Sequence, residues 1–490
     1  MGKFNLTALA GLMLLSGCSM APNYQLPEVA MADVYMHSGA QGTEQSSTFS
    51  QSWWTSFEDA ELNQLVEAAQ QQNITLKIAS ERIQSAQAYQ QSVASFKVPS
   101  LSVSGGYADI RLSQNEAMMG KVVSGVALPD MLGGGKLSLM SKDQQDFTLG
   151  LNASWELDLF GRIDSLSQAA SIGVEQANIM KNATNTLITA EVINNYLQYR
   201  GAEERIAIAR VNIQEQQQTL QLVESLTRHG YGSELDVANA KAALATTRSS
   251  LPMLETAKSV HLNRLAILLG ENIAQTQGRF SPLPLPAMNA LVPTGLPSEL
   301  LTRRPDIAMA ERTVAAQNQQ VGAAIASQYP SFFLTGAPSL VAGDFGDLFE
   351  ADSSSWVLGA GFSWNLFDGG RTEALLKMQQ AGFNEAVLNY QNTVNAAINE
   401  VETALKAYAN GQQYHQHMTE ANNQAQSAVD KATALYRAGL VNHLAVLDAQ
   451  RQKNQLQDAE VVARLNTATN VVLLHKALGG NWSVTPVPAP

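Results

Sequence analysis

Side chains that commonly act in catalysis or metal binding are few in this chain, and their spacing suits neither task. The 490 residues include seven histidines, of which only His415 and His417 lie close together. Two residues apart on a helix, they would face different directions and could not share a metal ion. The triple glycine at 133–135 is followed by Lys136 and Leu137, so the Gly-Lys-Ser/Thr sequence that completes a phosphate-binding loop is absent. We therefore expect no enzymatic activity, no metal and no other cofactor.

The single cysteine, Cys18, is the residue whose chemistry the sequence defines best. It follows a short segment with Lys3 and an apolar stretch, which is typical of a secretory signal and too short for a stable membrane anchor. The letters LSGC that end at Cys18 resemble the lipobox of bacterial lipoproteins, in which the cysteine thiol receives a diacylglycerol. This resemblance implies a signal peptide at 1–17 and an acylated Cys18. The residue after Cys18 is Ser19, and not the aspartate that is associated with retention in the inner membrane.

Net charge and apolar content limit the kinds of partner that the chain can have. The formal net charge of −12 argues against a nucleic acid as ligand. After the signal, no run approaches the ~18 apolar residues of a transmembrane helix. Any membrane crossing by the mature chain is therefore expected to use β-strands.

Two segments alternate apolar and polar residues over the length of a membrane-crossing strand. FTLGLNASWELDL begins at Phe147, and WVLGAGFSWNL begins at Trp356. Weaker alternation precedes each of them, near Leu101 and Phe332. Alternation over about 9–11 residues is typical of strands in outer-membrane barrels. It predicts four strands, at about residues 99–112, 146–160, 331–341 and 355–367.

Four strands cannot close a barrel by themselves. Open strand edges are not tolerated in lipid, and single-chain barrels begin at about eight strands. We therefore expect several copies of the chain to share one barrel. Because the longer loops of such barrels lie outside the cell, the helices that follow the strands should lie in the periplasm.

The strand pattern is part of an internal duplication. WELDLFGR at Trp155 and WNLFDGGR at Trp364 are offset by 209 residues (364 minus 155), and Gly230 and Gly439 have the same offset. Each phrase precedes a long segment without proline that would form a helix about 100 Å long. Each long helix is expected to turn at its glycine and to return as a second helix, which makes an antiparallel hairpin.

These elements predict two repeats, each with the order helix, strand, strand, long helix, turn and return helix. Several prolines after residue 281 mark the linker between them. The predicted parts are a signal peptide at 1–17, an acylated N-terminal segment at 18–58, a first repeat at 59–270, a linker at 271–297, a second repeat at 298–480 and a tail at 481–490. Within the repeats the predicted helices span about 59–96, 162–228, 234–270, 298–328, 371–437 and 443–479.

Four ordered stretches resemble the outer-membrane factors of bacterial tripartite efflux pumps, the TolC family, and in particular its lipidated OprM-like (NodT) branch. They are WWTSFEDAELNQLVEAA, LLTRRPDIAMAERTVAAQNQQVGAA, YPSFFLTG and YRAGLVNHLAVLDAQR. The resemblance runs from the signal to about residue 480. It implies a mainly α fold with transmembrane β: a homotrimer with a 12-stranded β-barrel, four strands per chain, continued by a long periplasmic α-helical barrel.

The resemblance also implies an activity, partners and a location. The chain would be the exit duct through which drugs and amphiphilic toxic compounds leave passively across the bacterial outer membrane. Energy would come from an inner-membrane pump of the RND or MFS type, through a periplasmic adaptor. The barrel would be surrounded by outer-membrane lipid, and no nucleic acid is involved.

At the periplasmic tip, the resemblance assigns a gate to Leu444 and Asp448. Asp448 matches an acidic ring in the pore, and Leu444 matches an apolar constriction beside it. Residues four apart share one helix face, so each trimer would stack the two rings. We expect the acidic ring to make the tip selective for cations.

A second assignment concerns the contacts that close the tip. Asp236 matches an acid of the first hairpin that bonds the Tyr or Arg before the second turn, here Tyr436 and Arg437. A hydrogen bond to a charged group contributes about 1.5 to 3 kcal/mol. Val441 stands where TolC itself has a basic latch residue, so that latch is not expected here.

Other functions stay open at this point. The channel could serve type I protein secretion or metal-ion efflux. The sequence gives a metal route little support, because Met118 and Met119 form the only adjacent methionine pair. A non-channel lipoprotein coiled-coil scaffold would explain the long helices, but it would not explain two matched pairs of membrane-length strands.

Overall fold

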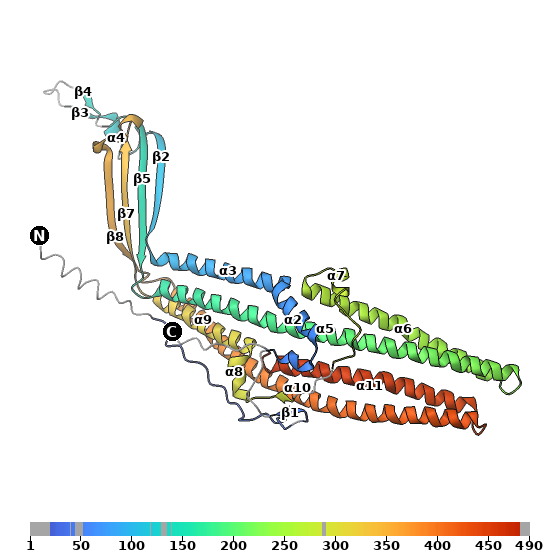
Figure 1. Ribbon diagram of the computed structural model, residues 1–490. Coiled ribbons are helices and arrows are strands. Elements are labelled where there is room, and N and C mark those ends of the chain that lie inside the picture. Colours follow the sequence, from blue (N-terminus) through green and yellow to red (C-terminus); the bar gives the residue numbers. More distant parts are fainter. Residues whose placement is uncertain are drawn as a thin grey trace. The chain divides into compact units, whose positions relative to one another are not determined.

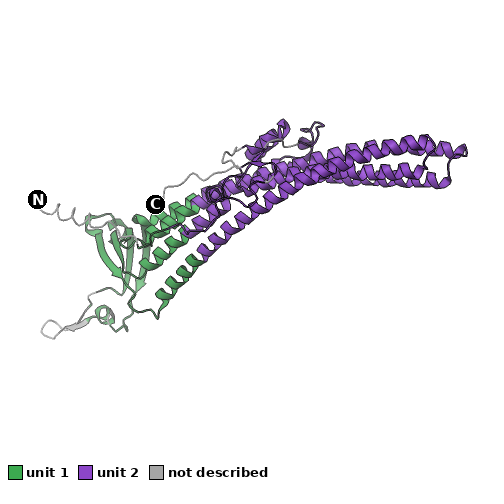
Figure 2. Ribbon diagram, turned by 90° about the horizontal axis from the view of Figure 1, so that it is seen from below, with its two compact units in different colours: residues 1–24, 86–173, 315–384 green, residues 25–85, 174–314, 385–490 purple. Residues whose placement is uncertain are grey.

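The computed structural model describes residues 20–39, 41–44, 52–117, 119–128, 135–138, 140–286 and 291–480. The predicted signal peptide, Cys18, Met118, Gly133, Gly134 and the predicted tail at 481–490 lie outside the described residues. The chain forms two compact units, coloured separately in Figure 2. One comprises Met1–Tyr24, Ala86–Gly173 and Ala315–Asn384, and the other comprises Gln25–Ser85, Val174–Val314 and Glu385–Pro490.

The first unit contains an antiparallel sheet of four strands with the order β2-β5-β7-β8 (Figure 1). Its strands are β2 (Ser100–Arg111), β5 (Asp143–Leu157), β7 (Ser331–Ala342) and β8 (Ser354–Ser363). The two strands of each repeat are neighbours, and β5 pairs with β7 to join the repeats. In this register Leu149 lies opposite Leu340, and Leu157 lies opposite Phe332.

The register gives the sheet one apolar face and one polar face. Residues directly opposite each other point to the same side of a sheet, and every second residue of a strand shares that side. The pairs Val103–Leu151, Leu149–Leu340 and Phe332–Phe362 therefore share one face. The other face carries small and polar pairs such as Ser102–Asn152. On the apolar face Val103 and Trp356 are each 71% exposed in the single chain.

The connections at one end of the sheet differ between the repeats. Between β2 and β5 lie α4 (Met119–Ser124) and a hairpin of β3 (Val126–Leu128) and β4 (Gly135–Leu137). The shorter connection of β7 to β8 contains the two 3-10 turns η5 (Phe345–Asp347) and η6 (Ala351–Ser353).

The long helices have equal lengths. Both α5 (Arg162–Arg228) and α10 (Arg371–Arg437) contain 67 residues, and their starts are offset by 209 (371 minus 162). The return helices α6 (Glu234–Leu269) and α11 (His443–Ala477) start with the same offset. Gly230 and Gly439 make the turns with φ of 80° and 72°, a backbone conformation that favours glycine.

A row of α10 side chains at heptad spacing is buried. Val394, Val401, Leu405 and Tyr408 are at most 2% exposed, while Ile398 is half-buried and its neighbour Ala397 lies in the core. Among the described residues, no helix combines the length and the apolar content needed to span a bilayer.

The helices that precede the strands are interrupted, whereas the sequence predicts one helix at about 59–96 and one at about 298–328. The first contains α2 (Ala60–Gln72) and α3 (Ile74–Ala94), followed by η2 (Ser95–Lys97). The second contains η4 (Pro297–Glu299), α8 (Leu300–Arg303) and α9 (Pro305–Ala326). The single-helix expectation is wrong in both repeats, because Asn73 and Arg304 separate the pieces.

Short elements complete the second unit. The turn η1 (Trp53–Phe57) precedes α2, and α7 (Ile273–Gln277) follows α6. Strand β1 (Thr43–Glu44) pairs in parallel with β6 (Val292–Pro293). Glu402 of α10 accepts hydrogen bonds from the backbone N–H groups of Met36 (2.6 Å) and His37 (3.2 Å). The segment before β1 is thereby attached to α10.

Candidate functional site

Asp236 lies in the first turn of α6 and is bonded locally. The Oγ atom of Ser233 accepts from the N–H of Asp236 at 3.2 Å, and Asp236 Oδ2 accepts from the N–H of Ser233 at 3.1 Å. The Ser233 hydroxyl also donates to Asp236 Oδ2 at 2.7 Å. This capping box satisfies two backbone donors at the helix start. The hydrogen bonds from the Ser233 side chain and backbone lower the pKa of Asp236.

At the turn between α10 and α11, Tyr436 and His443 lie close to Asp236 of α6. The rings of Tyr436 and His443 meet edge to face, with centroids 5.7 Å apart. Burial lowers the pKa of His443, while the negative charge of Asp236 acts in the opposite direction. Burial and then the same charge raise the pKa of Tyr436. Among the described residues, no hydrogen bond joins Asp236 to Tyr436 or Arg437, so the predicted tip-closing bond stays a prediction.

His443 occupies the first position of α11 and was not singled out by sequence reasoning. It is 3% exposed, and neither ring nitrogen has a hydrogen-bond partner within the described part of the chain. A buried imidazole without a partner is costly to protonate. The side chain is therefore held neutral at the hairpin turn.

Leu444 and Asp448 lie one turn apart near the start of α11. Leu444 is 46% exposed, and the Asp448 side chain is mainly exposed, with Oδ1 4.0 Å from Nη1 of Arg451. Asn442 caps the helix by accepting from the N–H of Ala445 at 3.2 Å. In the single chain, the side chains of both predicted gate residues are therefore accessible to solvent.

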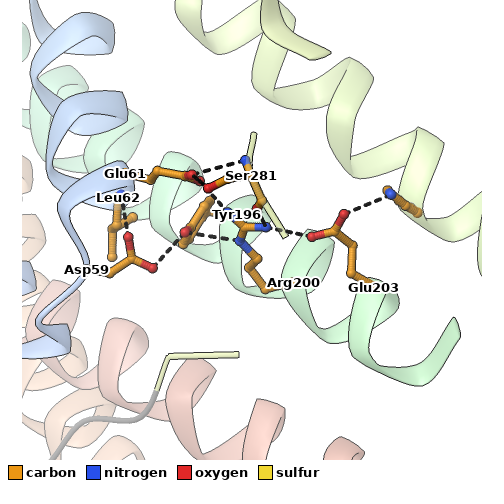
Figure 3. Close-up of polar contacts among 8 residues, drawn as sticks. Asp59, Glu61, Leu62, Tyr196, Arg200, Glu203 and Ser281 are labelled. Atoms are coloured by element: carbon orange, nitrogen blue, oxygen red, sulfur yellow. Dashed lines mark hydrogen bonds and ion pairs between the residues drawn. The ribbon is translucent and has the colours of Figure 1, made fainter. Parts of the chain in front are cut away.

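Figure 3 shows a buried cluster around Arg200 of α5 that sequence reasoning missed. The guanidinium donates to Glu203 Oε2 at 2.6 Å, to the Ser281 carbonyl at 2.7 Å and to the Tyr196 hydroxyl at 3.1 Å, and it pairs with Glu61. Burial by itself would lower the pKa of Arg200, but the contacts with Tyr196, Glu203 and Glu61 raise it overall. An arginine that is fully buried among these acceptors is fixed in its charged form.

Two acids of the FEDAEL stretch, Asp59 and Glu61, belong to the same cluster. Asp59 Oδ1 caps α2 by accepting from the N–H of Leu62 at 3.0 Å, and its Oδ2 accepts from the Tyr196 hydroxyl at 2.6 Å. Glu61 Oε1 accepts from the N–H of Ser281 at 3.1 Å. These contacts join α2 and the residues after α7 to α5. The stretch therefore has a structural role in the second unit.

Arg304 and Asn73 hold the ends of the two return helices in the same way. Arg304 Nη1 donates to the Ala477 carbonyl at 2.8 Å, and Asn73 Nδ2 donates to the Leu268 carbonyl at 2.7 Å. The two carbonyls are offset by 209 (477 minus 268), and the two donors by 231 (304 minus 73). Arg304 is also neutralised by Asp306 (2.8 Å) and Glu400 (2.6 Å). The second repeat thus caps its return helix with the charged Arg304 of the RRPD letters, and the first repeat caps its return helix with the neutral Asn73.

Comparison with known proteins agrees with this duplicated arrangement of strands and hairpins. The family model described as "Outer membrane efflux protein" matches residues 65–271 and 296–480. The chain belongs to this family. The match covers both repeats, and the family is one of efflux channels of the outer membrane.

Relatives match the chain over almost its whole length. Outer membrane protein OprJ of Pseudomonas aeruginosa is 31% identical over 486 residues, which cover 98% of this chain and 96% of the relative. The toluene efflux pump outer membrane protein TtgC of Pseudomonas putida is 29% identical with the same coverage. The solved outer-membrane channel OprN has a TM-score of 0.84 at 30% identity, with 94% of this chain and 99% of that chain covered.

These findings confirm the family, the fold class and the outer-membrane location that the sequence predicts for this efflux protein. They do not bear on Cys18, Leu444, Asp448, Asp236, Tyr436 or Arg437 individually. The roles of these six residues therefore stay predictions.

The Arg200 cluster makes a clear prediction for stability. Arg200→Met leaves Glu61 without its buried counter-ion and Glu203 with Lys258 alone, so we expect a loss of about 3 to 5 kcal/mol in the free energy of unfolding. Arg210→Met is the matched control, because Arg210 lies on the same helix and its pair with Glu255 of α6 is exposed, so the change should alter stability by less than about 1 kcal/mol. Chemical unfolding in detergent, followed by helical circular dichroism, measures both. Equal effects of the two variants would contradict this role of Arg200.

His443 predicts a pH dependence at the second turn. Because burial lowers its pKa, the packing around His443 is fully stable above the ordinary pKa of about 6.5 and weakens as the pH falls below it. The loss is at most about 1.4 kcal/mol per pH unit. His443→Phe keeps an aromatic ring against Tyr436 but removes the titration. Amide hydrogen exchange of residues 436–447, corrected for intrinsic rates, should increase toward acid pH in the wild type and not in the variant. An identical pH response of both proteins would exclude His443 as the cause.

Proposed function

We propose that the chain is the exit duct of a tripartite multidrug efflux pump and works as a homotrimer. Each subunit contributes four strands to a 12-stranded β-barrel and two helical hairpins to a periplasmic α-helical barrel. The observation that carries this proposal is the sheet, which has one apolar face, one polar face and two edges without a strand partner in the described chain.

The two strand edges require further copies of the chain. Within the described residues, β2 pairs only with β5, and β8 pairs only with β7. Unpaired N–H and C=O groups cost several kcal/mol each in hydrocarbon, so the edges must pair with strands of another subunit. Three subunits with four strands each exceed the minimum of about eight strands for a closed barrel.

Passive conduction of drugs and amphiphilic toxic compounds is the activity that this duct supports. Relatives are named as outer membrane proteins of antibiotic, solvent and toluene efflux pumps, at 28 to 29% identity. Outer membrane efflux proteins work with periplasmic adaptors and inner-membrane pumps. We infer such partners for this chain, with a pump of the RND or MFS type supplying the energy.

We infer further that Cys18 carries the lipid anchor. The residues that follow it are held in the first unit, where Asn318 Nδ2 donates to the Pro22 carbonyl at 2.7 Å and Ala21 packs against Gly322. An anchor three residues before Ala21 would be held by the same unit that contains the sheet. Mass spectrometry of the mature N-terminal peptide should show a diacylglyceryl group on Cys18 and no residues 1–17. An unmodified peptide would exclude the anchor.

For the periplasmic tip we propose a gate in which Leu444 and Asp448 form adjacent rings and Asp236 contacts Tyr436 or Arg437. Asp236→Ala/Tyr436→Phe removes the tip-closing contact and should raise the single-channel conductance several-fold, from a small wild-type value. The recording uses the purified trimer in a planar bilayer. A large wild-type conductance that the variant does not change would place the gate elsewhere. Absence of conductance from both proteins would exclude the channel.

Two control variants separate the parts of this gate. Ser233→Ala removes the cap bond of Asp236 but keeps its carboxylate, so it should leave the conductance small. A rise equal to that of the double variant would attribute the effect to the helix cap. Asp448→Asn should also leave the conductance small while it reduces the preference for cations. Unchanged ion selectivity would exclude Asp448 as the source of that preference.

A further inference from the structure

One face of the four-stranded sheet is polar, and a single aromatic side chain of the described strands lies on it. Phe332 belongs to the apolar face, so the next residue of β7, Phe333, points to the opposite side. Phe333 lies opposite Glu156 of β5 and opposite Gly361 of β8. The other aromatic residues of the four strands share the apolar face, and they are Tyr107, Phe147, Trp155, Phe332, Trp356 and Phe362.

The ring of Phe333 occupies the space that a side chain at position 361 would fill. A Cβ added to Gly361 would lie 2.7 Å from Cε2 and 2.9 Å from Cζ of Phe333. Phe333 is nevertheless 38% exposed. The ring is thus supported by β8 on one part of its surface and accessible on another part.

The neighbours of Phe333 on the polar face have short side chains. They are Ser154, Ser331, Thr335, Gly359 and Ser363. The longer neighbour, Glu156, is held by Arg162, whose Nη2 donates to both carboxylate oxygens at 2.9 and 2.8 Å. The accessible part of the ring is therefore bordered by small side chains, several of them with a hydroxyl group, and by a paired carboxylate.

The duplication shows that strand pairing does not need an aromatic residue at this place. Phe333 corresponds to Ser102 through the offset of 231 (333 minus 102), and Gly361 corresponds to Asn152 through the offset of 209 (361 minus 152). Ser102 and Asn152 lie opposite each other, as Phe333 and Gly361 do. The first repeat thus builds this place of the sheet from a polar pair, and the second repeat builds it from a ring over a glycine.

We propose that Phe333 is a binding site on the inner wall of the barrel for amphiphilic aromatic compounds. In membrane barrels the apolar side chains face lipid, and the polar face of the sheet lines the interior. Strand β7 lies between β5 and β8 (Figure 1), so both of its edges are paired within the chain and it pairs with no strand of another subunit. The exposed ring therefore faces the interior of the assembled barrel. This inference rests on the barrel of the proposed function and adds to it a substrate class and the residue that contacts it.

The site selects its ligands by aromatic stacking. A ring of the ligand packs on the accessible part of the Phe333 ring, in the offset or edge-to-face arrangements that aromatic pairs prefer. A cationic substituent is attracted to the face of the ring, and polar substituents can bond to the hydroxyl groups that border it. An aliphatic compound of equal charge lacks the stacking contact. The trimer has one such site in each subunit, and the polar pair of Ser102 and Asn152 takes the equivalent place in each first repeat.

Photolabelling of the purified native oligomer with an azide derivative of ethidium tests the site. Ethidium is a planar aromatic cation, and on illumination its azide derivative becomes attached to nearby residues. Mass spectrometry of the labelled peptides should place the label in β7 and β8 of the wild type. Phe333→Leu keeps an apolar cover over Gly361 but removes the aromatic ring, so the dye concentration for half-maximal labelling should rise about two- to ten-fold.

Control variants and a second ligand separate stacking from other causes of labelling. Phe333→Tyr keeps the ring and should be labelled like the wild type. Val357→Ala is the matched control, because Val357 is an exposed aliphatic residue of β8 on the same face, and it should not change the labelling. Tetrabutylammonium, an aliphatic cation of the same charge, should not displace the dye at concentrations at which unlabelled ethidium does. Equal half-maximal concentrations for the wild type and Phe333→Leu would overturn the site.

The first repeat allows a test in which a site is gained. Ser102→Phe/Asn152→Gly copies the ring over a glycine into β2 and β5, and it should raise the number of labelled sites per subunit from one to two. The additional label should lie in peptides of β2 and β5. An unchanged number of labelled sites in a native oligomer would contradict the proposal.

The mass of the native oligomer, measured without dye, separates this inference from the proposed function. If trimers form but the labelling does not depend on Phe333, the binding site is wrong while the channel stands. If the chain is monomeric in detergent and in lipid, the trimeric channel itself is overturned. Labelling of native trimers that depends on the ring of Phe333 supports both.

Discussion

Backbone hydrogen bonding at the strand edges is the constraint on which the rest of this molecule depends. A strand in hydrocarbon must pair every N–H and C=O group, and four strands leave two edges that the chain cannot pair by itself. The pairing of β5 with β7 uses one edge from each repeat and makes a single sheet from the duplication. The remaining edges, on β2 and β8, then make assembly a condition of membrane insertion. The helical hairpins follow the strands in both repeats, so the assembly that closes the sheet also brings the hairpins of different subunits together.

Much of the fold could be predicted from the sequence because its signals are periodic. Alternation from Phe147 onward and from Trp356 onward indicates strands whose apolar residues share a face. The register of the sheet places these apolar residues opposite one another on one face. Segments without proline between Arg162 and Arg228, and between Arg371 and Arg437, indicate the long helices. Such patterns extend over many residues, so a local exception does not change the conclusion drawn from them.

What could not be predicted depends on single side chains that act at a distance along the chain. Asn73 lies between α2 and α3, where its side-chain oxygen accepts from the N–H of Leu76 and its amide donates to a carbonyl 195 residues away. Arg200 looks like one more polar residue of a long helix, and only the folded chain shows that Glu61 and Ser281 surround it. Asp236 is an exception, because its bond to Ser233 is local and has the spacing of a capping box, which the resemblance to the family does not take into account. His443 gives no sequence signal, because its burial results from the packing of two hairpins.

The equal length of α5 and α10 restricts how such a protein can change in size. Both helices contain 67 residues, and their return helices α6 and α11 contain 36 and 35, so each return helix runs back along about half of its partner in both repeats. Adding one turn to α5 alone would move its charged residues away from their partners on α11. A longer duct therefore needs matched insertions in all four helices. The connection between β2 and β5 has no such partner, and it is the connection in which the two repeats differ by 22 residues, the difference between the offsets 231 and 209. Insertions should therefore accumulate in the loops beyond the sheet, while the helical part keeps a constant length.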